Sequence, residues 1–350
     1  MWHLDPPSAA ILSEYANRLE SNLEGRIQSY QGNYKKSIIK SVLLPNGSTS
    51  AIHKLLTGTP QQSHTLSNTL MRKILRKRHM AYSEHDLAKY QVAKRKKSKS
   101  RTKAEKNLVI KYDRLLSGLN SIFDYDGQVS RKSDFSYWLS ANKWTRTCTY
   151  CGREYIYTVE DLTPDDRIKH VARPDFDHFL PKELYPLLSL NFYNLIPCCP
   201  ICNRTVKGTK VFNLNDYVHP YLSQGEPRFK FSFSYVDPLH THGEVTITND
   251  TDPQENNTID AFQLRAFYKR HSETELDDLL RLTQKTGRQY IEDYLIKIMA
   301  GLNISTADAY RSMFGAEYYE SVQMERPLSK FKRDILKELG VYDLFKSEFE

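Results

Sequence analysis

Residues 148–208 hold the motifs that decide the fold: CTYCGREY (148–155), RPDFDHFLPKELYP (173–186) and FYNLIPCCPICNRTVKG (192–208). All five cysteines of the chain lie in this stretch, and four of them form the Cys-x-x-Cys pairs Cys148/Cys151 and Cys199/Cys202. Two such pairs offer four thiolates to one tetrahedral zinc ion, the pattern of a closed structural site. The 47 residues between the pairs are more than a simple zinc ribbon holds, so we expect the zinc to clamp a larger folded unit. Cys198 lies outside the two-residue spacing and is predicted to pack rather than to bind metal.

Polar residues follow a recognisable order between and after the two cysteine pairs. The order is Asp177-His178 with Pro181, then Asn194-Leu195 with Pro197, then Cys202-Asn203 with Lys207. Together with the cysteine pairs, this order resembles the HNH endonuclease family, the ββα-metal nucleases. The longer string DHFLPKELYPLLSLNFYNLIPCCPICN, followed by His219-Pro220-Tyr221, is most similar to the HNH subunit of Septu-type bacterial anti-phage systems, some of them retron-linked. The resemblance says little about residues 1–130.

This resemblance implies a metal-dependent endonuclease that hydrolyses phosphodiester bonds, with DNA the favoured substrate. Such hydrolysis needs an activated water and a cation that stabilises the developing negative charge. His178 suits the role of general base because imidazole titrates near neutral pH. Asp177 and Asn203 supply oxygen ligands, which favour Mg²⁺ or Mn²⁺ over a catalytic zinc ion. Asn194 matches the middle residue of the family motif. The resemblance implies that it fixes the loop that orients the histidine and that it binds no metal.

A second class of function also fits a zinc-binding sequence. A Cys-x-x-Cys pair alone can be only a zinc knuckle, and an Asp-His pair is often a surface feature, so the alternative is a zinc-stabilised nucleic-acid-binding or adaptor subunit without cleavage activity. The joint presence of Asp177, His178 and Asn203 favours the nuclease, since a module that does not cut needs none of them. Two lysines of the motif, Lys182 and Lys207, are candidates for phosphate contacts, with solvated lysines as the alternative. His219 is predicted to be a structural histidine rather than part of the site.

Charge is divided unevenly along the chain, whose net charge is +8. Residues 1–147 carry 26 Lys and Arg against 11 Asp and Glu, whereas residues 148–350 carry 24 against 31. Basic surfaces attract phosphate backbones through counterion release. The densest basic run is AKRKKSKSRTKAEK (93–106), in which we expect nucleic-acid contacts from Lys94, Arg95, Lys96 and Lys97. A solvated helix face or loop is the alternative for this run.

Hydrophobic periodicity predicts an α+β protein in three parts. Residues 1–140 are a basic helical region, residues 141–222 the zinc-clamped ββα-metal core, and residues 223–350 a small hairpin followed by helices. Helices are expected over residues 8–30 (with Ser8 as N-cap), 63–93, 107–123 and from Asn257 onward. Strands are expected at residues 154–159, 229–236 and 244–248, and residues 160–173 as a polar insertion.

The remaining predictions concern location and partners. The N-terminal MWHLDPPSAA has neither a basic nor an apolar signal-peptide region, and no run approaches 18 apolar residues, so we expect a cytoplasmic protein without membrane contact. Clustered cysteines in such a chain favour thiolate ligands over disulfides. No nucleotide-binding motif is visible. Septu-like HNH proteins act with an ATPase subunit, so the resemblance implies such a partner.

Overall fold

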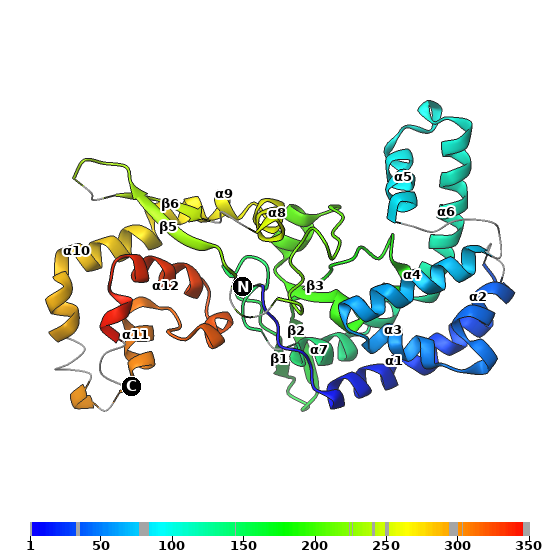
Figure 1. The fold of residues 1–350 in the computed structure, drawn as a ribbon. Coiled ribbons are helices and arrows are strands. Elements are labelled where there is room, and N and C mark those ends of the chain that lie inside the picture. The colour runs from blue at the N-terminus through cyan, green and yellow to red at the C-terminus, as the bar shows by residue number, and fades with distance from the viewer. Residues whose placement is uncertain are drawn as a thin grey trace.

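A computed structural model of the chain describes residues 2–32, 36–76, 84–143, 145–223, 225, 227–239, 242–248, 252–293, 300–302 and 304–345. Helices occupy both ends of the described chain, and its strands pair in two-stranded antiparallel sheets. This mixed architecture agrees with the predicted combination of helices and small sheets. Figure 1 shows an elongated molecule with N-terminal helices at one end, C-terminal helices at the other and strand β3 between them. Within the described residues, no helix is both long and apolar enough to cross a membrane.

The first helix begins where the sequence predicts. Helix α1 (Ala9–Ser29) follows the N-cap Ser8, whose hydroxyl accepts a hydrogen bond from the Ile11 amide at 3.3 Å. Its apolar stripe is buried, and the hydroxyl of Tyr15 donates to the carbonyl of Leu190 at 2.9 Å. Helices α2 (Lys36–Leu43), α3 (Ser50–Thr57) and α4 (Pro60–Arg76) complete this end of the molecule. The N-terminal helices therefore support the loop that precedes residue 192.

Helices α5 (Glu84–Arg95) and α6 (Lys103–Ile122) form a helical hairpin that we call the basic arm. The predicted helix over residues 63–93 corresponds to α4 and α5, and residues 77–83 lie outside the described part of the chain. Helix α6 begins four residues before the prediction because Thr102 and Glu105 cap it reciprocally. The Arg101 side chain caps the C-terminal end of α5 by donating to the carbonyls of Ala93 and Lys94, each at 2.8 Å.

The segment after α7 (Ser133–Ala141) corrects one prediction and adds a hairpin that was not predicted. Residues 154–158 form no strand beyond an isolated bridge between Thr147 and Tyr155. The polar insertion predicted for residues 160–173 lies ahead of β3 and is built as a hairpin, in which β1 (Val159–Leu162) pairs with β2 (Ile168–Ala172). Almost every residue of this hairpin is exposed, so its strands lack the apolar alternation that reveals a half-buried strand.

Two further hairpins follow. Strands β3 (Asp175–His178) and β4 (Leu195–Cys198) pair antiparallel, and a short π-helix, η6 (Ile201–Lys207), comes directly after them. Strands β5 (Lys230–Tyr235) and β6 (Gly243–Thr248) pair antiparallel, which confirms the predicted hairpin. The C-terminal helices are α8 (Pro253–Ala261), α9 (Leu264–Lys269), α10 (Glu275–Asp293), α11 (Thr306–Phe314) and α12 (Ser329–Glu338). Helix α8 begins before the predicted start because Asp252 caps it and Pro253 occupies its first position.

The turn between Cys148 and Gly152 joins the two ends of the chain. The Trp2 indole Nε1 donates to the carbonyl of Tyr150 at 2.8 Å, and the Tyr268 hydroxyl of α9 donates to the carbonyl of Cys151 at 2.7 Å. The Leu328 amide, just before α12, donates to the carbonyl of Gly152 at 2.8 Å. Three segments distant in sequence are thereby fixed to one turn, which also carries two of the cysteine ligand candidates.

Candidate functional site

The four cysteines of the two pairs form one buried cluster. The Sγ atoms of Cys148, Cys151, Cys199 and Cys202 all lie within 4.8 Å of one another. A tetrahedral zinc ion with Zn–S bonds of about 2.3 Å places its sulfurs about 3.8 Å apart, so the cluster fits such an ion. Backbone amides support the sulfurs: the Cys199 amide donates to Cys148 Sγ at 3.3 Å and the Cys202 amide to Cys199 Sγ at 3.4 Å. The cluster could therefore hold a metal ion such as zinc.

Cys198 lies outside this cluster although it is adjacent to Cys199. Its side chain is fully buried, and its thiol donates to the carbonyl of Asp175 at 3.8 Å. Burial raises the pKa of this thiol well above its usual value. It is therefore a packed, neutral thiol.

The β3–β4 hairpin and helix η6 bring the polar motif residues into one cleft. His178 pairs with Leu195 and Asp177 with Ile196 across the hairpin, and η6 turns back beside β3. A cleft of about 730 Å³ is lined by Asp177, His178 and Asn203 together with Lys182 and Lys207. The cleft thus gathers five motif residues that lie up to 30 positions apart in the sequence.

His178 has the geometry of a neutral base. Its Nε2 lies 2.9 Å from the carbonyl oxygen of Ser189, which can only accept a hydrogen bond, so Nε2 carries the proton and Nδ1 keeps its lone pair. The ring stands edge-on to Tyr125 with centroids 4.5 Å apart. The pKa of His178 is lowered to about 4, mainly by burial and in smaller part by the Lys182 charge, while the Ser189 hydrogen bond acts in the opposite direction. The imidazole is therefore uncharged at neutral pH, with its one proton on Nε2, and able to take a second proton at Nδ1.

Asn194 holds the loop that follows His178. Its Nδ2 donates to the carbonyls of Leu180 and Leu188 at 3.0 and 2.9 Å, and its Oδ1 accepts from the Leu180 amide at 2.7 Å. The side chain is 3% exposed and is not part of the cleft wall. Its amide oxygen and nitrogen are thus both engaged by the backbone of the loop.

A second asparagine, which sequence reasoning missed, extends this support. Asn191 Nδ2 donates to the carbonyls of Leu55 and Gly58 at 2.8 and 3.0 Å, and its Oδ1 accepts from the Asn194 amide at 3.0 Å. The loop is in this way tied to helix α3. No spacing rule in the sequence links residues 55 and 191, so only the tertiary structure identifies this contact.

Asp177 is held on both of its carboxylate oxygens. The Tyr150 hydroxyl donates to Oδ2 at 2.6 Å, and the Lys207 ammonium donates to Oδ1 at 2.7 Å. Lys207 also donates to the carbonyl of His178 at 2.7 Å. The side chains of Lys207 and Asp177 are only 3% and 6% exposed, so this is a buried ion pair. The sequence pointed to Lys207 as a phosphate contact but gave no sign of its pairing with Asp177.

Asn203 lies beside a second carboxylate that the sequence did not single out. Its Nδ2 donates to Asp175 Oδ2 at 3.2 Å, and Arg204 donates to both oxygens of Asp175 at 2.8 Å. Because Nδ2 faces Asp175, the amide oxygen Oδ1 of Asn203 is available as an acceptor.

The oxygen donors of this cleft are of the type that Mg²⁺ prefers. A carboxylate retains lone pairs beyond the two hydrogen bonds that Asp177 accepts, and Asn203 adds an amide oxygen. The Lys207 ammonium, however, already neutralises Asp177. A divalent cation at Asp177 would have to share this carboxylate with Lys207 or replace it.

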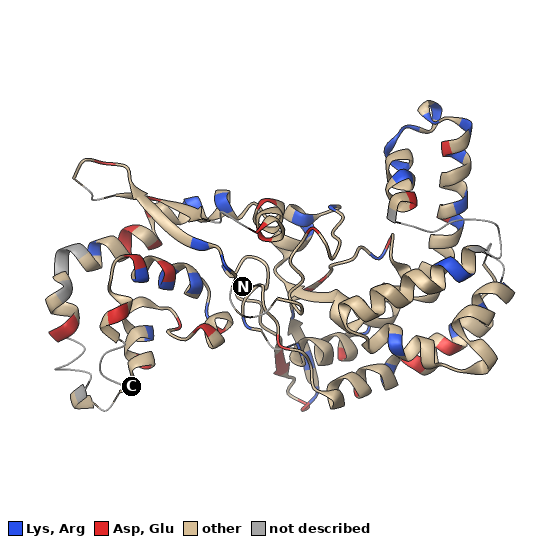
Figure 2. Ribbon diagram, in the orientation of Figure 1, with Lys and Arg blue, Asp and Glu red and all other residues tan. Residues whose placement is uncertain are grey.

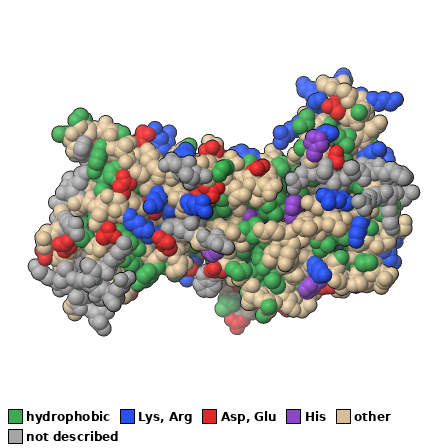
Figure 3. All heavy atoms as spheres, viewed as in Figure 1, with side chains coloured by type: hydrophobic (Ala, Val, Ile, Leu, Met, Phe, Trp, Pro, Cys, Tyr) green, Lys and Arg blue, Asp and Glu red, His purple; other side chains and the backbone are tan. Residues whose placement is uncertain are grey.

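The predicted basic contacts divide into two groups. Lys94 and Arg95, at the end of α5, line the same cleft as His178, together with Lys182 and Lys207. Lys96 and Lys97 are exposed on the basic arm away from the cleft wall. Figure 2 shows Lys and Arg along both helices of this arm, and Figure 3 shows their side chains gathered at its outer end.

Some of these cations already have carboxylate partners. Lys94 pairs with Asp113, Lys96 pairs with Glu105, and Lys182 Nζ lies 2.9 Å from Asp126. Arg95 and Lys97 are both exposed, and neither forms an ion pair with another described residue. Arg95 is therefore a cleft-lining cation without a carboxylate partner in the described part of the chain.

His219 lies in the core rather than in the cleft. It is 4% exposed, its Nδ1 accepts from the Tyr221 amide at 3.3 Å, and its ring packs on Phe179 with centroids 4.4 Å apart. Burial lowers its pKa to about 3, and the Lys143 charge acts in the same direction.

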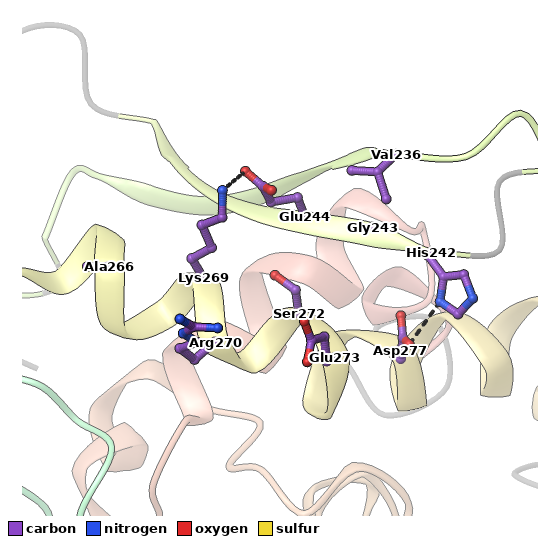
Figure 4. Close-up of a pocket in the computed structure, with 10 residues that line it drawn as sticks. All are labelled: Val236, His242, Gly243, Glu244, Ala266, Lys269, Arg270, Ser272, Glu273 and Asp277. Atoms are coloured by element: carbon purple, nitrogen blue, oxygen red, sulfur yellow. Dashed lines mark hydrogen bonds and ion pairs between the residues drawn. The ribbon is translucent and has the colours of Figure 1, made fainter.

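A second pocket, of about 440 Å³, lies between β6 and the segment from α9 to α10 (Figure 4). Two pairs of charged side chains meet in it: Lys269 contacts Glu244 at 2.7 Å, and His242 contacts Asp277 at 3.0 Å. Arg270 and Glu273 line the same pocket. The histidine of this pocket is thus paired with a carboxylate, whereas His178 in the first cleft is held by a backbone carbonyl.

Comparison of the chain with protein-family models, with curated proteins and with solved structures found no match.

Proposed function

We propose that this chain is a metal-dependent HNH endonuclease that hydrolyses phosphodiester bonds, with DNA as the favoured substrate. The observation that carries the proposal is the state of His178. Its imidazole is neutral, its Nε2–H is fixed on the Ser189 carbonyl, and it lies in one cleft with Asp177 and Asn203. This is the arrangement that a base-assisted attack of water on phosphorus needs.

His178 takes the proton of the attacking water at Nδ1. The imidazolium formed in this way keeps its Nε2–H on the Ser189 carbonyl, which stabilises the positive charge. A Mg²⁺ or Mn²⁺ ion, when bound, would supply Lewis-acid stabilisation of the negative charge that develops on the phosphate and on the leaving oxygen. Asp177 and Asn203 are the residues that would hold this ion. Arg95, which lines the cleft, would neutralise a neighbouring phosphate, and Lys182 would do so by exchanging its partner Asp126 for the phosphate.

One observation favours the alternative of a nucleic-acid-binding or adaptor subunit that does not cut. The Lys207 ammonium lies on Asp177, where a catalytic cation would bind. A panel of single- and double-stranded DNA and RNA, incubated with the protein and Mg²⁺ or Mn²⁺, separates the two functions. Cleavage of at least one substrate supports the nuclease and identifies its polymer. Tight binding without cleavage in every case supports the adaptor.

Replacing Asp177 or Asn203 with alanine should abolish cleavage and weaken binding of Mn²⁺, because each removes one oxygen ligand. Isothermal titration with Mn²⁺ measures this loss independently of activity. Asn213→Ala is the control, because within the described part of the chain the Asn213 side chain bonds only to residues of its own turn. Wild-type Mn²⁺ affinity in both Asp177→Ala and Asn203→Ala would exclude these residues as ligands.

The basic arm is proposed to hold the nucleic acid over the cleft. Arg95→Glu and Lys97→Glu make the same charge change, but only Arg95 lines the cleft. Both variants should flatten the salt dependence of binding, by about one unit of log–log slope or more for each phosphate contact that is lost. Arg95→Glu should also slow cleavage, whereas Lys97→Glu should not. We do not substitute Arg101, because its side chain donates hydrogen bonds to the last carbonyls of helix α5 and its loss would disturb the helix itself. Unchanged binding and salt slope in both variants would exclude the arm as a nucleic-acid contact.

The proposal includes a partner. The resemblance to Septu-type HNH subunits and the lack of a nucleotide-binding motif in the sequence support an ATPase subunit in a cytoplasmic anti-phage complex. It would dock on the helical regions flanking the cleft. Co-expression with the product of the neighbouring gene should yield one complex in light scattering. Two separate species at micromolar concentration would contradict a stable complex.

A further inference from the structure

We infer that Tyr150, inside the first cysteine pair, positions Asp177 for binding of a divalent cation, so that the cysteine cluster sets the geometry of the cleft. Tyr150 touches neither substrate nor reacting atoms; it acts through Asp177. The inference rests on the proposed function, since it concerns the cation site of the same cleft.

Tyr150 is fixed on every side. It lies between Cys148 and Cys151, its side chain is fully buried, and its ring stacks on Phe262 with centroids 4.1 Å apart. Its carbonyl accepts from the indole of Trp2 at 2.8 Å. The phenol is therefore held rigidly by the cysteine turn, and its hydroxyl reaches Asp177 Oδ2 at 2.6 Å.

The preceding residue strengthens the connection between the cysteine turn and the hairpin. Thr149 Oγ1 donates to the carbonyl of Pro197 in β4 at 2.7 Å. Asp177 lies on β3, directly paired with β4. The cysteine turn thus contacts both strands of the hairpin: β4 through the Pro197 carbonyl and β3 through the Asp177 carboxylate.

The Asp177 carboxylate accepts one hydrogen bond from a neutral donor and one from a charged donor. Tyr150 holds Oδ2 and Lys207 holds Oδ1. Without the phenol hydroxyl, Oδ2 would be a buried acceptor without a partner, which is costly, and the carboxylate would turn toward the Lys207 ammonium. Both oxygens would then serve the ion pair, and the carboxylate would bind a divalent cation less well. Partners that orient metal ligands are worth about 10–100-fold in metal affinity or activity.

Tyr150→Phe tests this inference because it removes only the hydroxyl and keeps the stacked ring. The matched control is Tyr268→Phe, since Tyr268 is equally buried and also bonds to the cysteine turn, but at the carbonyl of Cys151. Mn²⁺ affinity, measured from the electron paramagnetic resonance signal of free Mn²⁺, is the main readout. Zinc content and the melting temperature report on the cysteine cluster and the fold.

Tyr150→Phe should bind Mn²⁺ about 10–100-fold more weakly with its zinc content unchanged, whereas Tyr268→Phe should bind Mn²⁺ like the wild type. Wild-type Mn²⁺ affinity in Tyr150→Phe would overturn the inference. An equal loss in both variants would also overturn it, because the effect would then come from a loosened cysteine turn. A wild-type protein that neither binds Mn²⁺ nor cuts nucleic acid would overturn the proposed function itself, and the inference with it.

Discussion

Replacing His178 with alanine is expected to abolish cleavage, because a general base contributes about 10²–10⁴-fold to the rate of such a reaction. The loss should appear in single-turnover cleavage, where binding and product release do not limit the rate. The proposed metal ligands and the cysteine cluster are untouched by this change. Zinc content and Mn²⁺ affinity should therefore stay close to those of the wild type.

Two further variants separate loss of the base from loss of structure. His178→Gln keeps an amide that can donate to the Ser189 carbonyl but has no titratable nitrogen, so it should be as inactive as the alanine variant. His242→Ala removes a half-exposed histidine in the second pocket and should cut at the wild-type rate. Cleavage at the wild-type rate by a folded His178→Ala protein would exclude His178 as the base.

Replacing Cys199 with serine is expected to remove the zinc ion and to destabilise the whole protein. Structural zinc sites contribute about 10–16 kcal/mol of apparent binding free energy to folding. In this chain the effect should spread, because the turn at Cys148–Gly152 anchors the N-terminus, α9 and the residue before α12. Metal analysis and thermal unfolding of the purified variant should show loss of zinc together with a lower melting temperature or insoluble protein.

The adjacent cysteine provides the control. Cys198→Ser makes the same chemical change one residue earlier, at a buried thiol outside the cluster. It should keep its zinc, with at most the modest destabilisation of a buried hydroxyl. Full zinc content in Cys199→Ser, or well-folded wild-type protein without zinc, would contradict the four-thiolate site.

Local sequence signals predicted the parts of the structure that depend on short spacing. The cysteine pairs indicated the cluster, Ser8 indicated the start of α1, and apolar alternation indicated the β5–β6 hairpin. Each of these depends on residues that are close in sequence or on a fixed ligand geometry. The β1–β2 hairpin was missed because its exposed strands carry no apolar alternation.

Contacts between distant segments could not be predicted in the same way. The bond from Tyr150 to Asp177 and the ion pair from Lys207 to Asp177 depend on how the cysteine turn and η6 pack against β3. The position of Arg95 on the cleft depends on the direction of the basic arm. A single sequence records which charges are present, but the partner of a buried charge is set by the tertiary packing around it.

The most direct test of the proposed function is cleavage of a covalently closed plasmid, which offers no ends to an exonuclease. Purified protein with Mg²⁺ or Mn²⁺ should convert supercoiled plasmid to nicked or linear forms. Chelation of the divalent ion should stop the reaction, and added Mg²⁺ should restore it. Plasmid that stays supercoiled with zinc-loaded, folded protein at every divalent-ion concentration, while nucleic acid is still bound, would contradict the nuclease.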